Sequence, residues 1–410
     1  MSAPTIRIPW ELSIEHRWVA ESLAAAAGAR VTGDAGPELI LEHEDLDLAF
    51  RHLARAEELP GASADEHGRF PGSSSCLRRG EAPVDALVPK VASAIRKAGV
   101  EAAPVWPGGA RFFVVLSHDI DTPWRWTSTG LRGAASRLKH AAEGGRVREA
   151  LLEARGLARV PVHKLRGTDP NWSFVRVAEL ESRRGFASTS YVLAAHRDPH
   201  DGAAPEEYAA RRPRLVQELS LLGGEVGLHA SYRSGDDEAL LRAEKHDLEV
   251  LLGRPLRGLR FHYLRMRWHE VVGRLDRLGI EYDTSLGFSD RPGPRAGFSF
   301  PFRPWDHETG RPASFYELPL LLMDATLTES RYMHLSPSRG RKEVDRVLDR
   351  LAATGGGAAV LWHNDRFDRV YGRGWGGVYE HLLDGIVARG GTAGTGAALC
   401  DWWKAERCAF

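Results

Sequence analysis

The sequence has few cysteines, no long apolar segment and no excess of charge of either sign. Its three cysteines, Cys76, Cys400 and Cys408, are too few and too scattered for a disulfide framework or a Cys-x-x-Cys zinc site, so we expect ordinary thiols. No stretch reaches about 18 uninterrupted apolar residues, which argues against a membrane span. Lysine plus arginine equals aspartate plus glutamate, at 55 each, so bulk charge does not favour nucleic acid as a partner.

The start of the chain also lacks the basic and apolar regions of a secretory signal. We therefore expect a cytoplasmic protein. Hydrophobic residues make up 43% and charged residues 27% of the chain, which is typical of an ordinary globular protein. A length of 410 residues exceeds what one hydrophobic core usually serves, so the chain should hold one large and one smaller domain.

A cluster of turn-forming residues marks a plausible boundary between these domains. Residues 104–109 read Pro-Val-Trp-Pro-Gly-Gly, and two prolines with two glycines favour a turn or linker. Residues 1–108 would form a small mixed α/β domain, with helices at about 11–27, 47–58 and 84–98. Residues 109–410 would form the larger domain.

In the larger part, short apolar runs alternate with helical patterns. The predicted strands are 112–116, 189–193, 226–228, 258–261, Tyr282, 318–323 and 358–362. The predicted helices are about 173–184, 205–222, 237–252, 268–278, 340–353 and 377–389. This alternation predicts an α/β fold with a parallel sheet, and seven strands suit a (β/α)7-type barrel better than an open sheet. In such a barrel, chemistry sits at the C-terminal ends of the strands.

A basic amphipathic insertion at about 130–166 interrupts this alternation. It carries Arg132, Arg137, Lys139, Arg146, Arg148, Arg155, Arg159, Lys164 and Arg166. One interpretation is a solvated helical excursion, as charge runs usually are. The other is a cap over the site that contacts a diphosphate or a membrane surface.

Polar residues of the type found in metal hydrolases follow four of the predicted strands. They are Asp119 and Asp121, then His229, then Arg260 and His262, and finally His363. Each alone is weak, because a histidine after a strand is more often structural and an aspartate there is often a helix cap. Four such strand ends in one barrel indicate a metal-assisted site.

These motifs resemble those of the polysaccharide deacetylase family, carbohydrate esterase family 4. That family folds as a distorted barrel of about seven strands and removes N- or O-acetyl groups from sugars with a divalent metal, commonly zinc. The resemblance covers residues 111 to about 400 and implies that Asp119 is the catalytic base and Asp121 a metal ligand. One carboxylate has to stay off the metal to accept the proton of water, while the other binds it.

The sequence departs from the family in its second and third motifs. The second, His-x-x-x-His, has Arg233 at its second histidine position, and a guanidinium cannot bind a cation. The third, Arg-x-Pro-Tyr, reads Arg-Phe-His-Tyr at 260–263. We infer that His262 replaces the missing imidazole, so that Asp121, His229 and His262 hold the metal, for which we expect zinc. The alternative is a degenerate site that binds no metal.

The resemblance also implies roles for the residues around this metal set. Arg260 would pair with Asp119 and keep it ionised. His363 would be the general acid that protonates the leaving amine. The backbone N–H near Tyr263 would help to hold the oxyanion, and Tyr263 would contact substrate. His118 is expected beside the site as a supporting neighbour, although a ligand role stays open.

Two further stretches resemble one branch of the family. Residues 282–288, 295–297 and 301–306 are similar to a long loop on the substrate side, in which Asp283, Arg303 and Trp305 would stabilise the pocket and contact substrate. The alternative is that the charges only structure the loop and that the tryptophan belongs to the core. Residues 65–71, Asp-Glu-His-Gly-Arg-Phe-Pro, resemble the small domain that precedes the barrel in these proteins.

Three hypotheses for function follow. The first is a metal-dependent hydrolase that deacetylates an N-acetylated sugar, in a nucleotide- or lipid-linked form since we expect a cytoplasmic protein. The second is a deacylase of a non-sugar amide or an O-acyl ester, because a fold does not fix its substrate. The third is an inactive carbohydrate-binding barrel. Convergence of His262 with Asp121 and His229 on one point distinguishes the first two from the third.

Overall fold

The computed structural model describes residues 4–32, 36–103, 105–202, 204–368 and 370–407. Pro104, in the predicted boundary, and Cys408 lie outside these residues. Of the other cysteines, Cys76 is exposed and Cys400 is buried, and both are free thiols, as expected.

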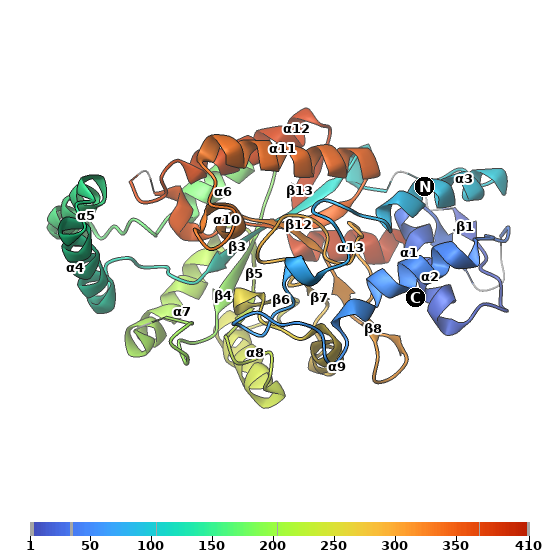
Figure 1. Cartoon of the computed structure of the whole chain (residues 1–410), viewed down its shortest axis with the longest axis horizontal. Coiled ribbons are helices and arrows are strands. Elements are labelled where there is room, and N and C mark those ends of the chain that lie inside the picture. Colours follow the sequence, from blue (N-terminus) through green and yellow to red (C-terminus); the bar gives the residue numbers. More distant parts are fainter. Residues whose placement is uncertain (1–3, 33–35, 104, 203, 369, 408–410) are drawn as a thin grey trace.

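A nine-stranded parallel sheet forms the centre of the molecule (Figure 1). Its strands are β3 (Phe113–Ile120), β4 (Thr189–Leu193), β5 (Glu225–Ala230), β6 (Gly258–Phe261), β7 (Tyr282–Asp283), β10 (Tyr316–Glu317), β11 (Leu320–Met323), β12 (Gly357–Leu361) and β13 (Thr392–Gly394). The strand order is β10-β7-β6-β5-β4-β3-β12-β11, and β13 pairs with β3 off this path.

The two ends of this order are one continuous stretch of chain, which turns the sheet into a barrel. β10 pairs with β7, β11 pairs with β12, and only Leu318 and Pro319 separate β10 from β11. The amide of Leu318 donates to Asp283 O at 2.9 Å, and Pro319 O accepts from the amide of Ala359 at 2.8 Å. The predicted α/β barrel with a parallel sheet is therefore confirmed, and it contains β10 and β13 besides the seven predicted strands. Proline has no N–H to continue a ladder, which fits its place where the segment changes partners.

Helices follow the strands along the chain and cover the barrel. They are α6 (Phe174–Ser182), α7 (Pro205–Leu221), α8 (Glu238–Leu252), α9 (Trp268–Leu278), α11 (Pro337–Thr354), α12 (Trp375–Ala388) and α13 (Gly396–Arg407). The sequence missed α13, β13 and the one-turn helix α10 (Asp324–Thr328). It also placed the end of the first strand too early: β3 extends to Ile120, because Ser117, His118 and Asp119 keep the extended backbone despite their polarity.

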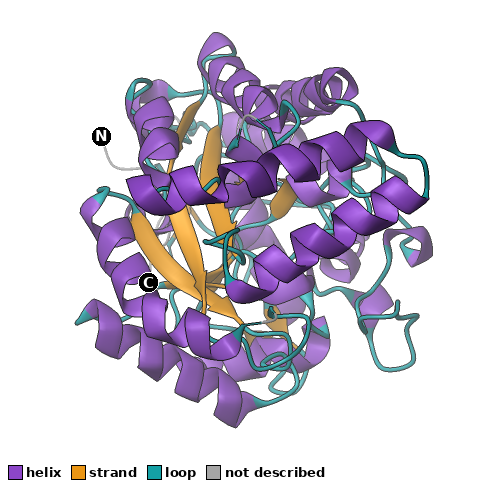
Figure 2. Cartoon of the chain, turned by 90° about the vertical axis from the view of Figure 1, so that its left-hand side faces the viewer, coloured by secondary structure: helices purple, strands orange, loops and turns teal. Residues whose placement is uncertain are grey.

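The predicted insertion is a hairpin of two helices, α4 (Ser128–Glu143) and α5 (Val147–Arg166). Thr127 caps α4, because its hydroxyl accepts from the amide of Gly130 at 2.9 Å. The hairpin lies at the left edge of the molecule in Figure 1, and the two helices cross the near side of the view in Figure 2. In the described part of the chain, no helix is both long and apolar enough to cross a lipid bilayer.

The N-terminal part is a small α/β unit. Strands β1 (Thr5–Ile6) and β2 (Arg30–Val31) pair in parallel beside helices α1 (Ile14–Ala26), α2 (His43–Leu53) and α3 (Val88–Lys97). The second helix begins at His43, earlier than the predicted 47–58. It also ends earlier, at Leu53, because Arg55 adopts a left-handed backbone.

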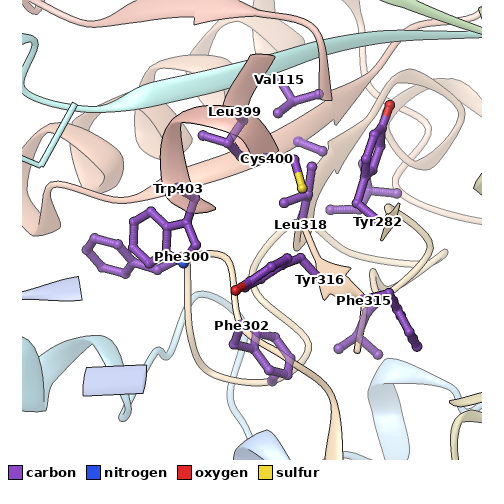
Figure 3. Packing of buried hydrophobic residues seen from close by; sticks show 14 of the residues in the cluster. Val115, Tyr282, Phe300, Phe302, Phe315, Tyr316, Leu318, Leu399, Cys400 and Trp403 are labelled. Atoms are coloured by element: carbon purple, nitrogen blue, oxygen red, sulfur yellow. The ribbon is translucent and has the colours of Figure 1, made fainter. Parts of the chain in front are cut away.

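The N-terminal part and the barrel share one hydrophobic core. Trp18 of α1 packs against Trp305 at 5.2 Å between ring centroids, and Trp106 stacks on Trp403 of α13 at 5.4 Å. Figure 3 shows part of this core, where Trp403 lies beside Phe300. The division at 108/109 stays a prediction, and the packing across it is continuous.

Buried polar contacts join the two parts as well. The Glu58 carboxylate accepts from Arg55 and from Arg295 of the barrel, and all three side chains are buried. Asp85 accepts from the amide and the hydroxyl of Ser299, both at 2.7 Å. Burial raises the pKa of Asp85 to about 7, although the bonds from Ser299 lower it.

We predict that Asp85 makes the protein less stable as the pH rises. Its folded-state pKa lies above the ordinary value of 3.8. Between about pH 4 and pH 7 the unfolded chain therefore loses a proton that the folded chain keeps, and the free energy of unfolding falls by an amount on the order of a few kcal/mol. In Asp85→Asn this part of the pH dependence should vanish. Thermal midpoints at pH 5 and pH 7.5 measure it.

The exposed Asp349→Asn serves as the control, and its midpoints should follow those of the unchanged protein. Equal pH dependence in Asp85→Asn and the unchanged protein would contradict the assignment to Asp85.

Candidate active site

The polar strand ends converge at one end of the barrel. Asp119 lies inside β3, and Asp121 follows the strand directly. Alternate residues of a strand face opposite sides, so Ser117 and Asp119 point into the barrel while His118 points outward. His118 contacts Trp362 O at 2.8 Å through Nδ1 and Glu181 at 2.9 Å through Nε2, outside the barrel. The expected role of His118 as a neighbour or ligand of the site is therefore wrong.

Asp121, His229 and His262 meet at one point, with ligand atoms all within 4.8 Å of one another. His229 Nε2 lies 3.2 Å from Asp121 Oδ1, and His262 Nε2 lies 3.6 Å from Asp121 Oδ2. His229 comes from β5, and His262 follows β6. The structure thus brings His262 together with Asp121 and His229, and its replacement of the motif histidine as a ligand stays a prediction.

Both imidazoles are held in orientation by hydrogen bonds at Nδ1, the ring nitrogen that does not face Asp121. His229 Nδ1 donates to Arg260 O at 3.0 Å, and His262 Nδ1 bonds to the buried Asp201 carboxylate at 2.9 Å. Because each Nδ1 is held in this way, each Nε2 faces the other ligand atoms, which is the orientation that a metal-binding histidine needs. Asp201 was missed by the sequence analysis, because it lies in a loop after β4 with no motif around it.

The donor set fits a divalent cation. His229 Nε2 and Asp121 Oδ1 are buried and have no hydrogen-bond partner, a costly arrangement for two polar atoms that face each other. Burial lowers the pKa of His262, but the carboxylates of Asp121 and Asp201 outweigh it and raise this pKa to about 9. The protonated His262 imidazole therefore carries positive charge at the place where a bound cation would carry it. Two imidazoles and one carboxylate suit a zinc-type site with an open position.

Arg233 takes no part in this set. Its side chain is 71% exposed, and its Nε donates to Asp198 at 2.7 Å. The guanidinium of Arg233 therefore lies outside the Asp121–His229–His262 set.

Asp119 and Arg260 form a buried ion pair beside the metal set. Arg260 Nη1 donates to Asp119 Oδ1 at 2.9 Å and to the Ser117 hydroxyl at 2.8 Å. The guanidinium also lies over the Tyr191 ring, 4.6 Å from its centroid. The other oxygen, Asp119 Oδ2, is 3.4 Å from His229 Nε2. The pairing expected from the motifs is present, and one oxygen of Asp119 faces the site.

His363 stands on the opposite side of Asp121, with its Nε2 3.5 Å from Asp121 Oδ2. Its Nδ1 bonds to Asp324 at 2.6 Å, and Arg366 donates to the other oxygen of Asp324 at 2.8 Å. Burial lowers the pKa of His363, but the carboxylates of Asp324, Asp121 and Asp119 raise it to about 10. The imidazole is therefore protonated at neutral pH. Asp324 follows β11, a strand end that the sequence analysis noted without assigning it a role.

These residues line an open cavity of about 230 Å³. Its wall includes Tyr263, which has a left-handed backbone with φ of 61°, and Tyr332. The N-terminal part contributes Arg69, whose Nη1 donates to Tyr263 O at 2.9 Å and whose Nη2 donates to the Tyr332 hydroxyl at 3.0 Å. Asp65 accepts from Arg69 Nε at 2.8 Å. The stretch 65–71, which had no role in the sequence analysis, thus forms part of the cavity wall.

Three of the expected substrate contacts lie elsewhere. Asp283 is fully buried and accepts from the amide and hydroxyl of Ser285. Trp305 is a core residue beneath α1, and Arg303 lines a separate cavity near Trp18. None of the three lines the cavity that contains His262, so the prediction of substrate contact is wrong for them. The alternatives of loop structuring and core packing describe them better.

No protein-family model matches the chain, and no curated protein matches it. Solved structures do resemble it. A putative polysaccharide deacetylase from Mycobacterium smegmatis shares 18% identity at a TM-score of 0.49, and a probable one from Pseudomonas aeruginosa PAO1 shares 14% at 0.48. A Puue allantoinase shares 14% at 0.47. Each alignment covers 76% of this chain and 96% of the other. At such identities the likeness concerns the fold alone.

We predict that the protein binds about one equivalent of zinc or a similar ion and that His262→Ala loses it. Removal of one imidazole from a three-residue set should weaken binding by at least ~10–100-fold. Elemental analysis of the reloaded, desalted proteins measures the metal content.

Arg233→Ala is the matched control, because it changes the family's motif position but not the set seen here, and it should keep its metal. Equal metal content in His262→Ala and the unchanged protein, or none in either, would rule out the set.

Proposed function

We propose that the protein is a metal-dependent hydrolase that removes an acetyl group from an N-acetylated sugar. The single observation that carries this proposal is that two separate proton-transfer groups, Asp119 and His363, lie beside the Asp121–His229–His262 set in one cavity. Hydrolysis of an amide needs a base for the attacking water and an acid for the leaving amine. One cavity offers both beside a cation site.

Asp121, His229 and His262 would hold the metal, for which we propose zinc. When bound, such a cation polarises an acyl oxygen and lowers the pKa of water toward neutrality. The chain's own contribution is to bind it by three groups and leave further positions open.

Asp119 would act as the base. Arg260 holds Asp119 Oδ1 and balances its charge inside the barrel, and Asp119 Oδ2 would accept the proton of water. Because Arg260 fixes only one of the two oxygens, the other keeps its freedom to receive that proton.

His363 would act as the acid. Asp324 holds Nδ1 and fixes the ring, so Nε2 presents its proton to the cavity. The raised pKa keeps this proton in place until the amine leaves as a stronger base.

The cavity wall would hold the oxyanion and the sugar. The left-handed turn at Tyr263 brings backbone amides to the rim, and Arg69 fixes that turn through the Tyr263 carbonyl. Arg331 and Tyr332 stand at the same rim, where they suit hydroxyl or anionic groups of a nucleotide- or lipid-linked sugar. A non-sugar amide or an O-acyl ester would meet the same acid and base.

We predict that the metal-loaded protein releases acetate from a member of an acetamido-sugar panel that includes nucleotide-linked sugars. In Asp119→Asn and His363→Gln the rate kcat should fall by at least ~100-fold with metal content retained, because each loses one proton transfer. Coupled assay of acetate measures it.

His381→Gln, which changes a half-buried histidine of α12 outside the cavity, should keep full activity. No acetate from any panel member, with identical behaviour of His363→Gln, would sink the proposal and leave a binding protein.

We further predict that Arg69→Met lowers kcat by ~10-fold or more while KM changes little. Arg69 fixes the backbone at Tyr263, so its loss should weaken oxyanion stabilisation more than ground-state binding. Steady-state kinetics on the substrate found above separate the two constants.

Arg78→Met is the control, since Arg78 belongs to the same N-terminal part but its side chain is 90% exposed. A rise in KM at unchanged kcat would show instead that Arg69 binds substrate directly.

A further inference from the structure

The outer face of α5 carries an apolar stripe. It consists of Val147, Leu151, Ala158, Val162 and Leu165. The four large members are 65%, 53%, 47% and 89% exposed, in that order. At 3.6 residues per turn, all five fall within an arc of about 60° on the helix surface. Single exposed apolar residues are ordinary on a protein surface, but five aligned along 20 residues of one helix are not.

Four arginines lie directly beside this apolar stripe. Arg148, Arg155, Arg159 and Arg166 are exposed and occupy the next ~40° of the same helix surface. Across the residues that the structure describes, none of the four forms an ion pair, whereas exposed arginines of other helices, such as Arg214 and Arg242, pair with a glutamate one turn away. The arginine row therefore presents its charge to whatever lies outside.

The opposite face of α5 is fixed to the rest of the molecule. Glu153 is buried and pairs with Arg137 at 2.7 Å and with Arg125 at 3.3 Å. At Gly156 the helix lies so close to Tyr371 that a Cβ atom would be 1.5 Å from its hydroxyl oxygen. These contacts prevent rotation of α5, so the apolar stripe cannot turn inward to find a core.

The hairpin also stands beside the cavity of the proposed site. The chain leaves the barrel at Asp121 and enters α4 seven residues later. A second cavity of about 370 Å³, lined by Arg125 and Arg137, adjoins the first, because Thr122 and Gly202 line both. The hairpin projects from the barrel (Figures 1 and 2).

We propose that α5 binds the surface of an anionic lipid membrane, with the apolar stripe inserted at the headgroup boundary and the arginine row on lipid phosphates. A helix that lies in a membrane interface has this composition: an apolar face, a basic face and a low net hydrophobicity. Arginine near anionic lipid adds favourable electrostatic energy that salt screens. The inference goes beyond the proposed reaction and does not depend on it.

Charge complementarity favours lipid over two other occupants. In a two-fold dimer through this face, each arginine row would approach its own copy, and like charges would repel. A polyanion alone would meet the arginines but leave the apolar stripe exposed. An anionic lipid surface satisfies both features at once.

The test is flotation of the full-length protein with vesicles of two compositions: phosphatidylcholine alone, and phosphatidylglycerol with phosphatidylcholine in equal parts. The protein should float with the second and not with the first, and less at high salt. Leu151→Ser/Val162→Ser/Leu165→Ser should reduce the floated fraction by ~10-fold or more, as should Arg148→Gln/Arg155→Gln/Arg159→Gln/Arg166→Gln.

Leu221→Ser/Val250→Ser is the matched control, because it removes two exposed apolar residues from α7 and α8 and should float unchanged. All the changed side chains are exposed, and circular dichroism verifies the fold of each variant. No flotation of the unchanged protein, or equal flotation of all variants, would overturn the proposal. A third result would also overturn it: light scattering shows a dimer of the unchanged protein, the triple serine variant is monomeric, and neither protein binds vesicles.

Discussion

The ion pair between Arg260 and Asp119 is the contact on which the rest of the site depends. Arg260 is completely buried, and its guanidinium holds Asp119 and Ser117 of β3 and the carbonyl of Thr284 beyond β7. Its own carbonyl accepts from His229 Nδ1 and so orients a proposed metal ligand on β5. One residue thus ties the proposed base, a proposed ligand and three strands together. Loss of one partner of such a buried pair typically costs about 3–5 kcal/mol.

Much of this arrangement can be predicted from the sequence, because its signals are short apolar runs and the polar residues that follow them. Apolar runs fix the strands, and the barrel brings their ends to one rim, so Asp121, His229 and His262 meet although 141 positions separate the first from the last. The convergence of His262 with this set was predictable on chemical grounds, since the guanidinium of Arg233 cannot bind a cation. The metal itself and the substrate have no such local signal, and both stay proposals.

The rest was not predictable because it depends on contacts between distant loops. No pattern in the sequence assigned a role to Asp201, Asp324 or Arg69, because each gains its role only from a partner brought near by the fold. Trp305 shows the converse error: an aromatic residue in a loop looks like a sugar platform, yet it packs under α1. The insertion could be interpreted as a solvated excursion or as a cap that contacts a diphosphate or a membrane surface. To choose between the two, one has to know which face of α5 the barrel leaves uncovered.

The bond from Arg69 to Tyr263 spans 194 positions of the chain, and it also orders events during synthesis. The N-terminal segment leaves the ribosome first, carrying Trp18 and its apolar neighbours, but Trp305 and the Tyr263 turn are translated much later. Until then that surface has no native cover and is exposed to aggregation or to chaperones. The nascent chain therefore completes this cavity wall only after Tyr263 has been synthesised, as a late and long-range folding step.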